Sequence, residues 1–221
     1  MAGWPASADE LREAQLKLAR ASPPPWRPAG APLSGACFVC SGRGKKGAGA
    51  AGDAAWAGAA LADGRIAVVA GAAGAPYEPG LIALREGPLL EAAVRALPEP
   101  PEVLIVNATG RDHPRRAGLA LHLGAVLELP TIGVTHRPLV AGGEWPAEAH
   151  GARSPLLLAG QQVALWLRTR AGTRPLAVHP GWQTDAETAA ELVLTLTGSR
   201  RTPEPLRLAR AAARSARAAA C

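Results

Sequence analysis

The hydrophobic positions of the first third of the chain fall into short apolar runs separated by Gly-, Pro- and Asp-rich segments. After an amphipathic pattern that predicts a helix over 9–21, these runs predict strands over 33–40, 54–61 and 65–70. The dipeptide Asp63-Gly64 between the last two runs is typical of a two-residue hairpin turn. The chain is therefore expected to open with a helix and an antiparallel meander.

Helical and strand patterns alternate in the rest of the chain. Helices are predicted over 86–97, 118–127, 185–196 and 203–220, and strands over 103–106, 131–134, 163–168 and 175–178. The run 103–106 is short and wholly apolar, as in strands buried in a parallel sheet. Thr184 or Asp185 is expected to cap the third of these helices. A meander followed by alternating helices and strands predicts one α/β domain with a mixed sheet over residues 1–221.

Composition narrows the function classes. The 24 Lys and Arg residues exceed the 18 Asp and Glu residues, which gives a net charge of +6 and suits a polyanionic partner such as nucleic acid. Apolar stretches such as 54–62 are far shorter than the roughly 20 residues that span a bilayer, so no membrane partner is expected. The N-terminus lacks the pattern of a secretory signal, which predicts a cytoplasmic protein.

A glycine-rich segment over 42–47 formally matches the dinucleotide-binding fingerprint. The residues that follow are too rich in glycine for the helix that this fingerprint requires, and the next predicted element is a strand. The segment is therefore interpreted as a hairpin loop whose Arg43, Lys45 and Lys46 could touch a phosphate backbone.

Five blocks of sequence, taken in order, carry a more specific signal. They are Pro76-Tyr77-Glu78-Pro79-Gly80-Leu81, Leu84-Arg85-Glu86-Gly87-Pro88, the segment from His113 to Gly124, Pro130-Thr131-Ile132-Gly133-Val134, and Thr202-Pro203-Glu204-Pro205-Leu206-Arg207. Together they closely resemble endonuclease V over residues of about 8 to 212. The resemblance implies a ribonuclease H-like fold with a mixed five-stranded sheet flanked by helices. It also implies a Mg²⁺- or Mn²⁺-dependent nuclease that cuts nucleic acid near inosine.

The chain departs from the family at most of the catalytic positions. The resemblance places the first metal-binding aspartate at Cys37, the second aspartate at Asn107, the lysine at His136 and the late histidine at Trp182. Only the glutamate is retained, as Glu86, which is then the one expected metal ligand. Divalent ions in such nucleases need clustered carboxylates, so the loss of two predicts impaired catalysis.

Two alternatives to an impaired nuclease remain open. The nearby Asp112 and Asp185 could replace the lost ligands, which would leave an active metal-dependent endonuclease with a rearranged site. A repurposed fold is the other alternative, in which Cys37, activated by His136 or His179, would act as a nucleophile on a small molecule.

The parts that recognise nucleic acid are better preserved. The resemblance assigns Tyr77 to the wedge that separates strands at the lesion. It assigns the grip on the flipped base to backbone groups of Gly80, Ile82 and Ala108, where Ala108 replaces a glycine. His113 and Arg115 are candidate phosphate contacts. The expected partner is therefore DNA or RNA, and the protein is taken as a monomer by default.

Overall fold

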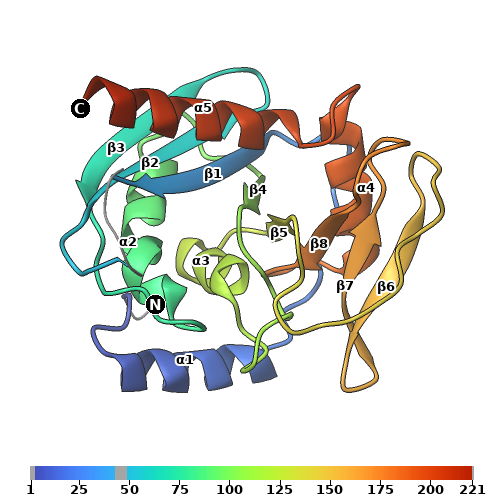
Figure 1. The fold of residues 1–221 in the computed structure, drawn as a ribbon, viewed down its shortest axis with the longest axis horizontal. Helices are drawn as coiled ribbons and strands as arrows, with labels where there is room; N and C mark the ends of the chain where they lie inside the picture. Colours follow the sequence, from blue (N-terminus) through green and yellow to red (C-terminus); the bar gives the residue numbers. More distant parts are fainter. Residues whose placement is uncertain (1–2, 43–48, 221) are drawn as a thin grey trace.

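The computed structural model describes residues 3–42 and 49–220 (Figure 1). Arg43 to Gly47 of the glycine-rich motif lie outside the described residues. The strands are β1 (Ser34–Ser41), β2 (Ala54–Leu61), β3 (Ile66–Ala72), β4 (Val103–Val106), β5 (Thr131–Thr135), β6 (Arg153–Leu158), β7 (Gln161–Leu167) and β8 (Leu176–Pro180). The helices are α1 (Ala8–Arg20), α2 (Ile82–Arg95), α3 (Leu119–Leu127), α4 (Ala186–Thr197) and α5 (Glu204–Ala219).

The described strands form one mixed sheet in the order β3-β2-β1-β4-β5-β8-β7-β6. β4 pairs in parallel with β1 and with β5, and the other pairs are antiparallel. This arrangement confirms the predicted mixed α/β sheet. The implied count of five strands is wrong, because β8, β7 and β6 continue the same sheet to eight strands.

Strand β6 is the one strand that the sequence pattern did not predict. It lies at the edge of the sheet and contains Pro155, which lowers the strand signal of the segment. Proline is tolerated on an edge strand because some N–H groups of such a strand face solvent, where no neighbouring strand needs them as hydrogen-bond donors.

Helices cover both faces of the sheet (Figure 1). On one face, α2 and α3 pack over a core that includes Cys37 and Val106. On the other face, α4 and α5 pack over a core that includes Ala36 and Ile105. Neighbouring residues of β1 and β4 therefore enter different cores, as the alternation of side chains in a strand requires.

Helix α2 begins at Ile82, four residues before the predicted start at Glu86. The helical pattern was recognised from apolar residues at 89, 90, 94 and 97, which lie after the first turn, and Pro88 lies inside the helix. The earlier start places Glu86 in the second turn of α2.

Helix α5 approaches the sheet very closely at Gly58 of β2. A Cβ atom built on Gly58 would stand 2.5 Å from the carbonyl oxygen of Ala209, so any side chain there would push α5 away. Pro203 precedes the helix and Glu204 lies in its first turn, which are favourable start signals. The close approach brings Arg210, the next residue of α5, towards the end of β4.

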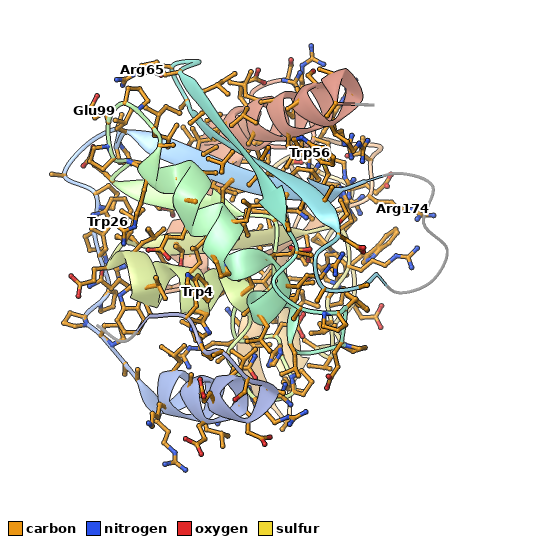
Figure 2. The ribbon with its side chains drawn as sticks, turned by 90° about the vertical axis from the view of Figure 1, so that its left-hand side faces the viewer. Trp4, Trp26, Trp56, Arg65, Glu99 and Arg174 are labelled. Carbon is orange, nitrogen blue, oxygen red and sulfur yellow. The ribbon has the colours of Figure 1, made fainter. Side chains whose placement is uncertain are left out.

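The N-terminal segment is fastened to helices α2 and α3 through Trp4 (Figure 2). Its indole ring stacks on His122 with ring centroids 4.8 Å apart, and its Nε1–H donates to Glu91 Oε2 at 2.6 Å. No described helix is both long and apolar enough to cross a membrane.

Candidate functional site

Three of the five predicted catalytic positions lie together near the C-terminal end of the central strand β4. In the parallel pairing of β1 with β4, Cys37 lies opposite Val106, and Asn107 follows directly. Glu86 reaches the same place from α2, and Cys37, Glu86 and Asn107 all line a cavity of about 80 Å³. The structure therefore brings together Cys37, Glu86 and Asn107, as the resemblance implies.

Trp182 lies at the opposite end of the central strands. It follows β8, which runs antiparallel to β5, so it stands beside the first residue of β5, while Asn107 stands at the far end of β4. The Trp182 backbone N–H donates to Thr131 Oγ1 at 2.8 Å. The assignment of a catalytic position to Trp182 is therefore corrected, because its backbone is fixed at the wrong end of the central strands.

His136 follows β5 and lies exposed at the rim of the site. Its Nδ1 is 3.0 Å from Nη1 of Arg201. Burial and the charges of Arg201 and Arg210 lower the pKa of His136. Because Arg201 can only donate, Nδ1 accepts and the proton of the neutral ring lies on Nε2.

The two acidic groups of the small cavity hold their protons more tightly than usual. Burial raises the pKa of Glu86 to about 7, against the smaller opposing effect of the Arg85 charge. Burial, and next the charge of Glu86, raise the pKa of the Cys37 thiol far above its ordinary value. At neutral pH the site therefore holds a neutral thiol and a carboxyl group that is ionised in only part of the molecules.

The raised pKa of Glu86 predicts a pH-dependent stability. Since the folded state binds this proton more tightly than the unfolded state, stability falls as pH rises from about 4.5 to about 7. Glu86→Gln removes this loss. We expect its stabilising effect to be about 2 to 3 kcal/mol greater at pH 8.5 than at pH 5, measured by urea unfolding. Glu13→Gln, on the exposed side of α1, is the control, and an equal effect at both pH values would contradict the prediction.

Arg210 enters the site from α5, on the other side of the sheet. Its Nη2 donates to Oδ1 of Asn107, and its guanidinium lies 5.5 Å from the ring centroid of Phe38. None of the sequence motifs pointed to this residue. The signal was present, because Arg210, Arg214 and Arg217 are spaced by four and three residues and so share one side of a helix.

This set of side chains does not suit Mg²⁺ or Mn²⁺. Such hard ions are held by charged oxygen ligands, whereas Cys37 offers a neutral thiol and Asn107 already accepts from a cation. Glu86 is the remaining carboxyl group, and its proton competes with a metal near neutral pH. Among the described residues, no group of three or more His, Cys, Asp or Glu side chains could hold a metal ion.

The two nearby aspartates do not replace the lost ligands. Asp112 is fully buried and accepts hydrogen bonds from the backbone N–H groups of three successive residues, Leu139, Val140 and Ala141. Asp185 caps α4 through the backbone N–H of Thr188 at 2.8 Å and pairs with Arg27. Both carboxylates are therefore committed to holding loops and helices in place, and the predicted cap of α4 is Asp185 rather than Thr184.

The geometry also argues against a thiol nucleophile at Cys37. His179 is fully buried, with Nε2 2.9 Å from Thr135 Oγ1 and Nδ1 3.9 Å from Asp112 Oδ2. Burial lowers its pKa to about 4 in spite of the Asp112 charge. His136 is engaged with Arg201, so neither histidine is paired with the thiol.

A larger cavity of about 290 Å³ adjoins the small one, because Glu86 and Asn107 line both. Gly80, Ile82 and Ala108 also line it, as expected for groups that grip a base. The methyl group of Ala108 causes no backbone strain, since this residue is not among those with positive φ.

Tyr77 stands at this larger cavity with 46% of its surface exposed. Its backbone N–H donates to Gly49 O at 3.1 Å, which fixes the backbone while the ring stays in solvent. An exposed aromatic ring beside a cavity is available to stack on a base.

His113 and Arg115 both form hydrogen bonds within the protein. The carbonyl of Gly80 lies 2.8 Å from Arg115 Nη2, 3.1 Å from His113 Nε2 and 3.0 Å from Gln15 Nε2. Gly80 has φ of +80°, a conformation that favours glycine. The two predicted phosphate contacts therefore hold the turn that begins the wall of the larger cavity.

The chain is similar in sequence to known proteins of one family. The family model for endonuclease V matches residues 39–211. The endonuclease V of Methanopyrus kandleri is 44% identical over 142 residues, which cover 64% of this chain and 61% of that protein. This chain therefore spans about three fifths of the length of that curated relative.

Solved structures share the fold over nearly the whole chain. The endonuclease V structure from Streptomyces avermitilis has a TM-score of 0.88 and 35% identity, and the match covers 100% of this chain and 97% of that one. Endonuclease V from Ciona intestinalis, solved with a 24mer DNA containing an inosine followed by a ribo-adenosine, has a TM-score of 0.74. It is 20% identical, with 96% of this chain and 98% of that one covered, and it supports the fold alone.

Proposed function

Because the chain belongs to the endonuclease V family, we propose that it binds nucleic acid, including inosine-containing strands, without metal-dependent cleavage. One observation carries this proposal. A cavity with an exposed aromatic ring adjoins a site in which Arg210 donates a hydrogen bond to Asn107, the position that the resemblance gives to a metal-binding aspartate.

The binding half of the proposal rests on the larger cavity. Gly80, Ile82 and Ala108 line it, and Tyr77 stands partly exposed at its side. A flipped base needs a pocket with polar backbone groups and an aromatic surface for stacking. The net charge of +6 supplies the long-range attraction for a phosphate backbone.

The loss of cleavage follows from the small cavity. Activation of water by a metal requires charged ligands that hold the ion and lower the pKa of its bound water. Cys37 and Asn107 are neutral, and Arg210 places a positive charge directly beside the Asn107 oxygen that would have to bind a metal ion. Glu86 alone does not compensate for this change in charge.

Binding and cleavage should be measured on the same labelled strands. We expect inosine-containing DNA or RNA to bind with the same affinity in excess EDTA and in Mg²⁺ or Mn²⁺, with no product in either case. Matched strands without inosine and single-stranded and duplex forms show whether the base is recognised. Divalent-dependent cleavage that disappears in Glu86→Ala would overturn the proposal in favour of an active endonuclease with rearranged ligands.

A further inference from the structure

Two arginines of α5 flank the ring of Phe38 at the exposed side of the site. The guanidinium carbon of Arg210 lies 5.5 Å and that of Arg214 lies 5.6 Å from the ring centroid. An aromatic ring attracts cations through its negative face and so fixes their position. Phe38 packs on the α5 side of the sheet, and the hydrogen bond from Arg210 to Asn107, which lines the small cavity, connects this cluster to that cavity.

The positive charge at this place is not balanced by neighbouring carboxylates. Burial, the charge of Arg214 and the charge of Arg201 all lower the pKa of Arg210. Among the ion pairs of the described residues, none includes Arg201, Arg210 or Arg214. The cluster therefore has an excess of positive charge, with His136 beside it as a further N–H donor.

Arg210 is held in a fixed orientation with hydrogen-bonding capacity to spare. Asn107 accepts from Nη2, and Phe38 supports the flat guanidinium. A guanidinium group has five N–H donors in a planar fork that matches two oxygens of a phosphate. The single hydrogen bond that the structure gives to Arg210 leaves most of these donors for a ligand.

We propose that the former metal centre is a metal-free phosphate site, in which Arg210 supplies the positive charge that binds a backbone phosphate of nucleic acid. This inference rests on the proposed function and names the group that performs the binding. A phosphodiester carries one negative charge, which the Arg210 cation matches without a metal. Arg214, against the same Phe38 ring, and His136, hydrogen-bonded to Arg201, would supply further contacts for that backbone.

The test is the affinity of a short labelled inosine-containing oligonucleotide, measured by fluorescence anisotropy in EDTA over a range of NaCl concentrations. We expect Arg210→Ala to weaken binding about tenfold or more, because a charge-assisted hydrogen bond is lost. The slope of log Kd against log salt should fall by about one, as expected for one phosphate contact. Arg210→Lys keeps the charge but loses the fork, so we expect an intermediate affinity.

Arg207→Ala is the matched control. It lies one turn earlier on α5, where it pairs with Glu204, and we expect less than a twofold change. Melting temperatures of all variants show that each is folded, and Arg210→Gln gives a second variant of similar size.

The outcomes separate the two proposals. Binding by the natural protein that Arg210→Ala and Arg210→Gln leave unchanged would overturn the phosphate site while the proposed function stands. Absence of nucleic-acid binding by the natural protein would overturn both. Tighter binding on addition of Mg²⁺ would also overturn the phosphate site, because it would show that a metal still supplies the positive charge.

Discussion

Restoring both carboxylates and removing the arginine should give this site a divalent metal. In the variant Cys37→Asp/Asn107→Asp/Arg210→Ala, three carboxyl groups including Glu86 surround the small cavity. At Mn²⁺ concentrations about 100-fold above the Kd, the ion would stabilise the fold by about 2.7 kcal/mol. We therefore expect a rise in melting temperature of about 5 to 10 °C, whereas the natural protein should shift by less than about 1 °C.

Arg210 decides whether the two aspartates are sufficient. In Cys37→Asp/Asn107→Asp, Arg210 would pair with the new carboxylate at position 107, to which it already donates as an asparagine. We expect less than half of the Mn²⁺ effect in this double variant, because an ion pair neutralises one ligand. Cys37→Ala/Asn107→Ala/Arg210→Ala removes the same side chains without adding charge and should show no Mn²⁺ effect.

The same variants separate metal binding from cleavage. In EDTA the variant Cys37→Asp/Asn107→Asp/Arg210→Ala should be less stable than the alanine control, because burying several carboxylates together is costly without a cation. Cleavage of inosine-containing strands is the second readout. Our account of why the site does not suit a metal would be contradicted if Mn²⁺ raised the melting temperature of the natural protein. It would also be contradicted if Mn²⁺ left the melting temperature of Cys37→Asp/Asn107→Asp/Arg210→Ala unchanged.

The sequence predicted the elements of this fold better than their relation to one another. The ranges 54–61 and 103–106 were predicted to the residue, because each is an apolar run bounded by turn residues. Cys37 and Asn107 meet because β1 and β4 pair in parallel, and Glu86 joins them from α2, which packs on that face of the sheet. The resemblance implied this arrangement, and no local pattern shows it. Strand β6 escaped prediction because an edge strand with a proline carries little strand signal.

The errors at the site have a common physical origin. The resemblance assigned the late catalytic histidine to the position of Trp182. The antiparallel pairing of β8 with β5 places Trp182 at the other end of the central strands, away from Asn107. Arg210 belongs to an arginine-rich C-terminal segment that no motif of the sequence connects to the site. It reaches the site because α5 packs against Gly58, a long-range contact that composition and periodicity do not contain.

Replacing Arg85 should destabilise the fold more than any surface change on the same helix. Its side chain is 6% exposed, and its guanidinium donates to the carbonyls of Ala50 at 2.9 Å and Ala75 at 2.8 Å. It also pairs with Asp53 Oδ2 at 3.3 Å. Arg85→Met keeps the apolar stem but removes the charge from this buried pair. We expect a loss of about 3 to 5 kcal/mol in the free energy of unfolding, measured with urea.

Two further variants show that the loss comes from the buried pair. Arg95→Met removes an exposed arginine of the same helix that bonds Glu91, and should cost less than about 0.5 kcal/mol. In Arg85→Met/Asp53→Asn both charges are gone, so we expect the loss to be smaller than the sum of the two single losses. A loss below about 1 kcal/mol in Arg85→Met would show that this pair does not hold α2 in place. Because Glu86 is the next residue, the placement of the site's one retained carboxyl group would then depend on the packing of α2 alone.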